Sequence, residues 1–280
     1  MAALNEAAAR RTRTPDWTPY RLTGTGGPGQ ITLLQGPAGT GRQRRRILVA
    51  LPPGTEPGTT RRLPVLYLHD GQNLFDPATS HAGDWGLVTI LNELARDGVE
   101  TIVVGVPHRG RLRSYEYNPF RDLRHGGGGG DRYLEYLFGT VMPLVERSFP
   151  ARTGPGHTAI GGASLGGLIS LYALWRRPGV FGAASVQSPA LWVAGRAIFR
   201  FLERHPVRPP ARIYLDVGTA EGPEAIRDAR ALRDWLHQAG QGEGVPEADL
   251  RYLEDPVGTH TESAWGRRLR DAIPFLLSGR

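Results

Sequence analysis

Short apolar runs alternate with longer segments of helical periodicity from Leu63 to the end of the chain, and glycine-rich turns separate them. The predicted strands cover residues 64–68, 101–106, 182–186, 212–217 and 250–253, together with a run that begins at Thr158. The predicted helices cover residues 85–94, 133–149, 165–177, 223–237 and 262–277, and one more follows Trp192 and runs through about Glu203. Uninterrupted apolar strands are typical of sheets with helices on both faces, so the alternation predicts one doubly wound, mostly parallel sheet.

Two further strands are predicted ahead of this region, at residues 30–35 and 44–51, with a Gly/Pro turn between them that indicates antiparallel pairing. Residues 1–25 are polar and arginine-rich, so we expect an arm or tail there, followed by a single α/β domain over residues 26–280. Residues 109–131 lack periodicity and contain five consecutive glycines. We expect them to form a long loop, too flexible for the core, part of which borders the functional site.

The composition excludes several classes of site. The chain has no cysteine, which rules out disulfides, thiolate metal sites and a cysteine nucleophile. Residues 1–15 lack the apolar segment of a secretory signal and no run approaches a membrane span, so a soluble, cytoplasmic protein is expected. All 34 basic residues are arginines, and the net charge is +7. They are scattered among acidic residues, which favours a solvated surface over a nucleic-acid-binding stripe.

The strongest candidate for chemistry is Ser164, in the sequence Gly-Ala-Ser-Leu-Gly between a predicted strand and a predicted helix. The G-x-S-x-G pattern is that of a nucleophile elbow, where a serine occupies a sharp strand-to-helix turn and small neighbours allow the close approach. At the start of the helix, the N–H of Leu165 would be available to stabilise an oxyanion. The pentapeptide alone is a weak signal, and its placement gives it weight.

A serine nucleophile needs a histidine base and an acid that orients the histidine, and in this architecture they follow in the order Ser, acid, His. His260 follows the last predicted strand and is the candidate base. Glu221 lies in the loop after the strand at 212–217 and is the preferred acid, with Asp216 inside that strand as the alternative. Asp228 is expected on a helix surface. The carboxyl ends of parallel strands share one sheet edge, so these groups are predicted to converge.

The second oxyanion donor is expected in the loop after the strand at 64–68. Gly71 would let the backbone approach a substrate carbonyl, and the N–H of Gln72 is the candidate donor. His69 and Asp70 resemble metal ligands, but no second ligand pair has metal spacing, so we predict a structural hydrogen-bonding role and no metal.

Candidates for the pocket wall are Asp84, Trp85 and Trp192, for which ordinary core packing is an equal alternative. Arg109, Arg111 and Arg113 would favour an anionic substrate if they border the site, and are otherwise solvated loop residues.

Several segments taken together resemble the putative esterase family, which includes enterochelin and feruloyl esterases. They are LYLHDGQNLF at 66–75, EYNP at 116–119, the Ser164 turn, SPALW at 188–192, DVGTAE at 216–221 and GTHTESAW at 258–265. The resemblance covers about residues 63–277. It implies an α/β-hydrolase fold and a triad of Ser164, His260 and Glu221, and some family members lack a clear acid and work with a weakened triad.

We therefore expect a serine carboxylesterase, similar to the enterochelin esterases, that acts on a small-molecule ester and requires no cofactor. Acyl transfer with the same triad and a non-catalytic binding protein that keeps the fold are the alternatives. The sequence leaves open the ester, its acyl chain, the oligomeric state and the role of the arginine-rich N-terminus.

Overall fold

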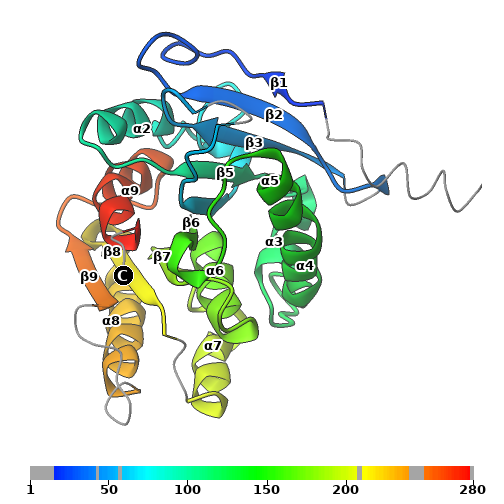
Figure 1. The fold of residues 1–280 in the computed structure, drawn as a ribbon. Coiled ribbons are helices and arrows are strands. Elements are labelled where there is room, and N and C mark those ends of the chain that lie inside the picture. The colour runs from blue at the N-terminus through cyan, green and yellow to red at the C-terminus, as the bar shows by residue number, and fades with distance from the viewer. Residues whose placement is uncertain (1–15, 42–43, 56–58, 207–209, 240–248, 278–280) are drawn as a thin grey trace, which may run out of the picture.

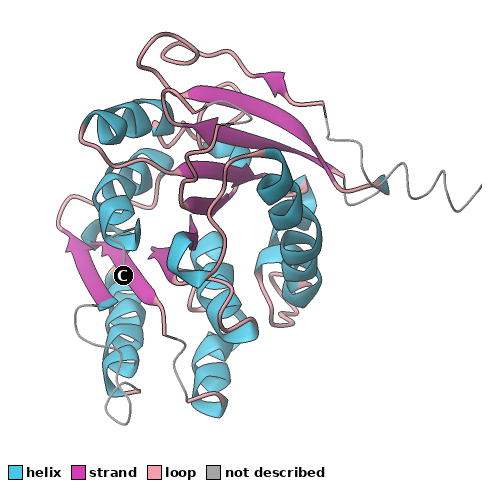
Figure 2. Ribbon diagram, viewed as in Figure 1, coloured by secondary structure: helices cyan, strands magenta, loops and turns pink. Residues whose placement is uncertain are grey.

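The computed structural model describes residues 16–41, 44–55, 59–206, 210–239 and 249–277. Within them, one sheet has the strand order β1-β2-β3-β5-β4-β6-β7-β8-β9. The strands are β1 (Thr18–Pro19), β2 (Thr32–Ala38), β3 (Arg45–Leu51), β4 (Val65–His69), β5 (Ile102–Val106), β6 (Thr158–Ala163), β7 (Ala183–Gln187), β8 (Arg212–Gly218) and β9 (Leu250–Asp255). The sheet forms the centre of the molecule and carries all the elements that position the site (Figures 1 and 2).

The direction of the strands agrees with the expected fold. Strand β1 pairs antiparallel with β2, β2 with β3, and β3 with β5. All pairs from β5 through β4, β6, β7 and β8 to β9 are parallel. The prediction of a mostly parallel, doubly wound sheet with antiparallel N-terminal strands is confirmed.

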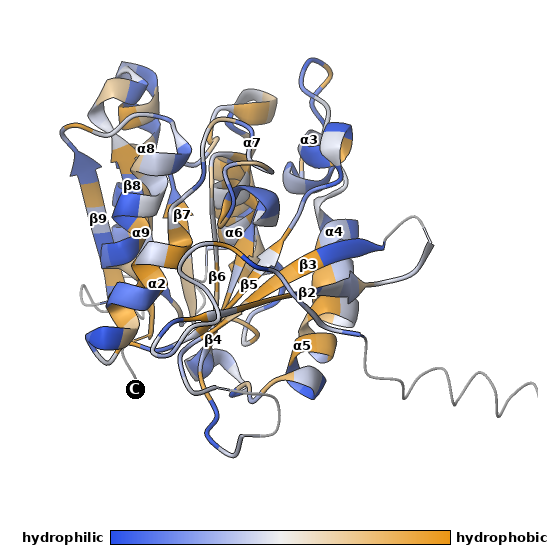
Figure 3. Ribbon diagram, turned by 90° about the horizontal axis from the view of Figure 1, so that it is seen from above, coloured by the Kyte–Doolittle hydropathy of each residue, from blue (hydrophilic) through white to orange (hydrophobic). Residues whose placement is uncertain are grey.

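Helices cover both faces of the sheet. The α-helices are α2 (Leu87–Arg96), α3 (Arg113–Tyr117), α4 (Gly130–Tyr136), α5 (Met142–Ser148), α6 (Leu165–Arg176), α7 (Val193–Arg204), α8 (Pro223–Gln238) and α9 (Glu262–Leu277). Helices α2 and α9 pack on one face in one apolar core, and α4 to α8 contribute to a second core on the other (Figure 1). The central strands are largely apolar, whereas the edge strand β9 ends in polar residues (Figure 3).

The expectation of a flexible loop over residues 109–131 is wrong for part of that segment. It contains helix α3, in which Glu116 and Tyr117 are buried. Glu116 forms a buried ion pair of 2.8 Å with Arg45 on β3, and Gly130 is the buried first residue of α4. The segment is ordered by tertiary contacts, which a search for local periodicity does not detect.

Some element boundaries differ from those predicted. Helix α2 begins at Leu87, because Gly86 before it has a left-handed φ of 66°, so Trp85 lies outside the helix. Residues 137–141 form a π-helical turn between α4 and α5. Thr18 and Pro19 form β1 beside β2, while residues 1–15 lie outside the described residues. The domain boundary at residue 25 stays a prediction.

Among the described residues, no helix has both the length and the apolar character that crossing a membrane requires. The cytoplasmic location stays a prediction from the sequence.

Candidate active site

Ser164 lies in the turn between β6 and α6, with φ 58° and ψ −120°. A non-glycine residue in this region of backbone space costs on the order of 1–3 kcal/mol, so the surrounding contacts must hold it there. The flanking glycines explain how the turn closes. A Cβ on Gly162 would lie 3.0 Å from the backbone of Gly166, and one on Gly167 would lie 2.9 Å from the carbonyl oxygen of Gln187. The turn therefore requires small residues on both sides of the serine.

Backbone hydrogen bonds tie this turn to the neighbouring strand β7. The N–H of Ser164 donates to the Gln187 carbonyl at 3.0 Å, and the Ser164 carbonyl accepts from the N–H of Ala190 at 3.0 Å. Leu165 is the first residue of α6, and the first N–H groups of a helix have no partner within the helix. The predicted donor is therefore at the helix start, directly after the serine.

Ser164 and His260 line the same cavity, of about 430 Å³, at the carboxyl edge of the sheet. The residues that line it are Asp70, Asn73, His81, Ala82, Trp85, His108, Arg113, Ser164, His260, Glu262 and Trp265. Ser164 follows β6, Asp70 follows β4, and His260 lies between β9 and α9. The sheet thus gathers loops that are far apart in the chain, as expected for parallel strands.

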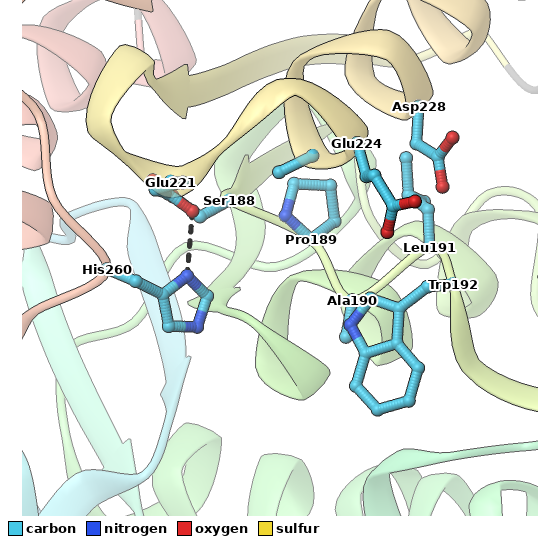
Figure 4. A pocket seen from close by; sticks show the side chains of 10 residues that line it. Ser188, Pro189, Ala190, Leu191, Trp192, Glu221, Glu224, Asp228 and His260 are labelled. Atoms are coloured by element: carbon cyan, nitrogen blue, oxygen red, sulfur yellow. Dashed lines mark hydrogen bonds and ion pairs between the residues drawn. The ribbon is translucent and has the colours of Figure 1, made fainter.

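His260 is held by two side chains. Its Nδ1 lies 2.7 Å from Oε2 of Glu221, drawn as the dashed line in Figure 4. Its ring stands edge-on to the ring of Trp265, with 4.9 Å between the centroids. A carboxylate at Nδ1 favours the tautomer that carries a proton there, which leaves Nε2 free to accept one.

Glu221 belongs to a short 3-10 turn after β8, at Thr219–Glu221, and its side chain is buried. Its Oε1 accepts from the Ser188 hydroxyl at 2.5 Å and from the N–H of Gly218 at 2.7 Å. Burial opposes ionisation, but the hydrogen bonds from His260, Ser188 and Gly218 outweigh it, so the pKa of Glu221 is lowered. The carboxylate facing His260 is therefore held in its charged form.

Asp216, the alternative acid, makes other contacts. It is fully buried in β8, where its carboxylate accepts from Gln187 Nε2 and from the N–H of Ser188, each at 3.1 Å. Its Oδ2 is also 3.1 Å from Nε of Arg268. Burial raises the pKa of Asp216 to about 6, although the positive charge of Arg268 acts to lower it. These contacts anchor the loop after β7, and the carboxylate in contact with His260 belongs to Glu221.

The expectation that Asp228 lies on a helix surface is wrong. It is on α8 but only 5% exposed, and its Oδ1 lies 3.2 Å from Nη2 of Arg196. Arg196 belongs to α7, so the ion pair is a contact between two helices that a helical pattern does not reveal.

Gly71 and Gln72 belong to a 3-10 turn, Gly71–Asn73, directly after β4. Asp70 and Asn73, on either side of Gly71 and Gln72, line the Ser164 cavity. The Gln72 carbonyl, in the peptide between Gln72 and Asn73, accepts from Thr79 Oγ1 at 2.7 Å. A Cβ on Gly71 would lie 2.5 Å from the carbonyl carbon of Gly105 on β5. Packing against β5 therefore requires a glycine at position 71, and its role toward a substrate stays a prediction.

His69 and Asp70 make hydrogen bonds and ion pairs inside the protein. His69 Nδ1 lies 2.7 Å from the Tyr133 hydroxyl, and burial lowers the pKa of this histidine to about 3. Both oxygens of Asp70 are paired with Arg113, at 2.8 and 2.7 Å. No group of three or more His, Asp or Glu residues in the described part of the chain has an arrangement that could hold a metal ion.

A second cavity, of about 230 Å³, adjoins His260 (Figure 4). The side chain of Trp192 is 54% exposed and forms part of its wall, opposite His260. Trp85 instead lines the Ser164 cavity, where its ring lies 5.9 Å from that of Trp265. Asp84 is half-buried, and burial raises its pKa, but it lines neither cavity. Of the three wall candidates, the tryptophans border the two cavities and Asp84 does not.

Sequence reasoning missed several residues around the site. No role is predicted from the sequence for Arg268 on α9, and Trp265, Asn73 and Ser188 enter only as members of the quoted motifs. The signal for Arg268 was its position in the middle of an amphipathic helix. A guanidinium that is buried there needs polar partners, which indicates a buried polar cluster. Of the three loop arginines, Arg113 lines the Ser164 cavity, whereas Arg109 pairs with Glu116 at 2.7 Å.

A mostly parallel sheet with a serine in the turn after a central strand and a histidine beyond the last strand is the fold of the α/β-hydrolases. A model of the putative esterase family matches residues 39–276. The chain belongs to the putative esterase family and is a carboxylic ester hydrolase.

The chain is similar to other proteins over different shares of its length. The uncharacterized protein YbbA of Bacillus subtilis is 25% identical over 83% of this chain and 92% of its own length. The siderophore triacetylfusarinine C esterase of Aspergillus fumigatus is 33% identical over 46% of this chain, which spans about half of that protein (45%). The solved structure of siderophore hydrolase EstB from Aspergillus nidulans has a TM-score of 0.66 at 20% identity. It covers 92% of this chain and 97% of its own, and at this identity shows the fold alone.

Proposed function

We propose that this protein hydrolyses a small-molecule carboxylic ester through an acyl-enzyme formed on Ser164. The observation that carries the proposal is the 2.7 Å contact of His260 with Glu221 beside the cavity that Ser164 and His260 share. A carboxylate that holds the histidine tautomer, a histidine with a free Nε2 and a serine in an elbow are the three parts that serine hydrolysis needs.

In the proposed reaction, Nε2 of His260 takes the hydroxyl proton as Ser164 Oγ attacks the ester carbonyl. The tetrahedral intermediate places its oxyanion at the N–H groups of Leu165 and Gln72, each worth about 3 kcal/mol of the barrier. The histidine then gives its proton to the departing alcohol. A water molecule, deprotonated by the same histidine, attacks the acyl-enzyme, and the acid is released as Ser164 is restored.

Hydrolysis is favoured over acyl transfer by the exposure of the base. The side chain of His260 is 48% exposed, so water reaches the acyl-enzyme without a lid. Acyl transfer requires that water be kept from this intermediate, and the described residues provide no cover over His260 of that kind.

We further propose that the substrate is an ester of the siderophore class, because the Aspergillus fumigatus relative is named for such an ester. Two cavities meet at His260, of about 430 and 230 Å³. A large ester would place its acyl part in one and its alcohol part in the other, with Trp85 and Trp192 against its apolar or aromatic groups.

The test is the replacement of the nucleophile. Ser164→Ala is expected to abolish p-nitrophenyl acetate hydrolysis and labelling by a fluorophosphonate probe, while the wild-type protein shows both. If the variant retains the full rate, the acyl-enzyme mechanism is wrong. A panel of esters that includes intact siderophores and simple aryl and alkyl esters then tests the substrate class, which fails if siderophores are the poorest substrates.

A further inference from the structure

A buried polar cluster surrounds the Oε1 oxygen of Glu221, the oxygen that does not face His260. It consists of Ser188, which follows β7, and of Trp265 and Arg268, one turn apart on α9. Arg268 is 2% exposed and Ser188 is 3% exposed. Trp265 and Arg268 both donate to the Ser188 hydroxyl, which in turn donates to one oxygen of Glu221.

The hydrogen bonds of Ser188 determine where its hydroxyl proton points. Its Oγ accepts from Trp265 Nε1 at 3.1 Å and from Arg268 Nη2 at 2.7 Å. Both partners are donors only, and a hydroxyl oxygen has two lone pairs, so both lone pairs are occupied. The remaining O–H can only donate, and the acceptor in reach is Oε1 of Glu221 at 2.5 Å. The cluster therefore forces the serine to act as a donor to this carboxylate.

The same hydrogen bonds determine which of the two oxygens of Glu221 faces His260. Oε1 receives the Ser188 hydroxyl and the N–H of Gly218, which leaves Oε2 for His260. Glu221 is at the end of a three-residue turn, where a glutamate side chain has several rotamers available. The two donors on Oε1 select the rotamer in which Oε2 meets the histidine.

Electrostatics act in the same direction. The guanidinium of Arg268 is 3.6 Å from Oε1 of Glu221, 3.1 Å from Asp216 and 3.4 Å from Asp255. Asp255 is also paired with Arg267 at 2.6 Å, so it does not depend on Arg268 alone. A buried cation at this distance stabilises the charged form of Glu221, which the histidine needs as its partner.

We propose that Ser188 and Arg268 are positioning residues that hold Glu221 ionised and oriented toward His260. Asp216 belongs to the same cluster, because its carboxylate accepts a hydrogen bond from the N–H of Ser188 and forms an ion pair with the guanidinium of Arg268. This inference rests on the proposed function, in which Glu221 is the acid of the triad. It adds a chain of contacts from β8 and α9 to the base, which the G-x-S-x-G pattern does not include.

The test uses Ser188→Ala, which removes the shared hydroxyl. We expect kcat for p-nitrophenyl acetate to fall on the order of 10- to 100-fold with KM little changed, because only the alignment of the base is lost. In the Glu221→Gln background the same change is expected to have almost no effect on kcat, because the carboxylate through which Ser188 acts is gone. The far-downfield proton resonance of the His260–Glu221 hydrogen bond should be present in the wild type and absent from Ser188→Ala.

Ser185→Ala is the matched control, since Ser185 is a fully buried serine on β7 whose hydroxyl has no hydrogen-bond partner among the described residues. It should leave kcat within about twofold. Equal losses from Ser188→Ala in both backgrounds, or an unchanged kcat, would overturn the inference. Such a result is distinct from failure of the proposed function, which is recognised by an active Ser164→Ala variant. Urea unfolding of each variant confirms that the kinetics are measured on folded protein.

Discussion

Nδ1 of His260 lies 2.7 Å from Oε2 of Glu221, although the two residues are 39 positions apart in the chain. The neighbouring strands β8 and β9 bring them together, because Glu221 follows the first and His260 follows the second. This relationship makes a direct prediction about the chemistry.

Glu221→Gln is expected to lower kcat for p-nitrophenyl acetate about 10³-fold or more, because an amide does not stabilise the imidazolium that forms on His260. KM should change little, since the side chain of Glu221 is only 3% exposed and its oxygens are occupied by His260, Ser188 and Gly218. Steady-state kinetics measure both. Glu203→Gln, an exposed position on α7, serves as the control and should leave both constants unchanged. A loss below fivefold would argue that the histidine works without this carboxylate.

The raised pKa of Asp216 should make the stability of the protein depend on pH. Its pKa rises on folding from the usual 3.8 to about 6, so the folded state binds the proton more tightly than the unfolded chain. Its contribution to stability is therefore greatest below pH 3.8 and is lost as the pH rises through 6. Relative to Asp216→Asn, the wild-type free energy of unfolding should fall by on the order of 1 kcal/mol between pH 5 and pH 7. Urea titrations at both pH values measure it, and a constant difference would contradict the assignment.

A side chain at position 71 is expected to lower both the stability of the protein and its catalytic rate. Gly71→Ala is expected to lower the free energy of unfolding by about 1–3 kcal/mol, because the new Cβ meets the backbone of Gly105. It should also lower kcat, since the turn that carries Gln72 must move. Gly139→Ala is the matched control in a helical turn with open space around it, and should be neutral or stabilising. Chemical unfolding and steady-state kinetics on the same samples measure the two effects. Wild-type stability in Gly71→Ala would mean that the close approach is relieved elsewhere.

Trp192 predicts an effect on substrate binding that is separate from stability. Trp192→Ala should raise KM for aromatic esters about fivefold, because the indole is an exposed wall of the cavity beside His260. The free energy of unfolding should change by less than about 0.5 kcal/mol. Leu123→Ala removes another exposed apolar side chain that lines neither cavity, and should leave KM unchanged. If the two variants behave alike, the second cavity does not bind the ester.

Much of the architecture could be predicted because it depends on local pattern. Continuous apolar runs of the right length indicated β4, β5 and β8, and the glycines around Ser164 indicated the sharp turn before α6. The segment around α3 could not be predicted in this way, because its order comes from the buried pair of Glu116 with Arg45, which are 71 positions apart. Asp228 was misjudged for a similar reason, since it is buried and paired with Arg196 on another helix, α7.

The sequence by itself determined the doubly wound sheet, the Ser164 turn and the order in which serine, acidic residue and histidine follow their strands. These follow from periodicity, from glycine spacing and from the rule that parallel strands present their carboxyl ends at one edge. Only the tertiary structure decided that Glu221 rather than Asp216 contacts His260, and that Ser188 and Arg268 lie behind it. The reason is physical. These hydrogen bonds form only if β8, β9 and α9 pack with the side chains at hydrogen-bond distance, and no local pattern in the chain predicts that packing.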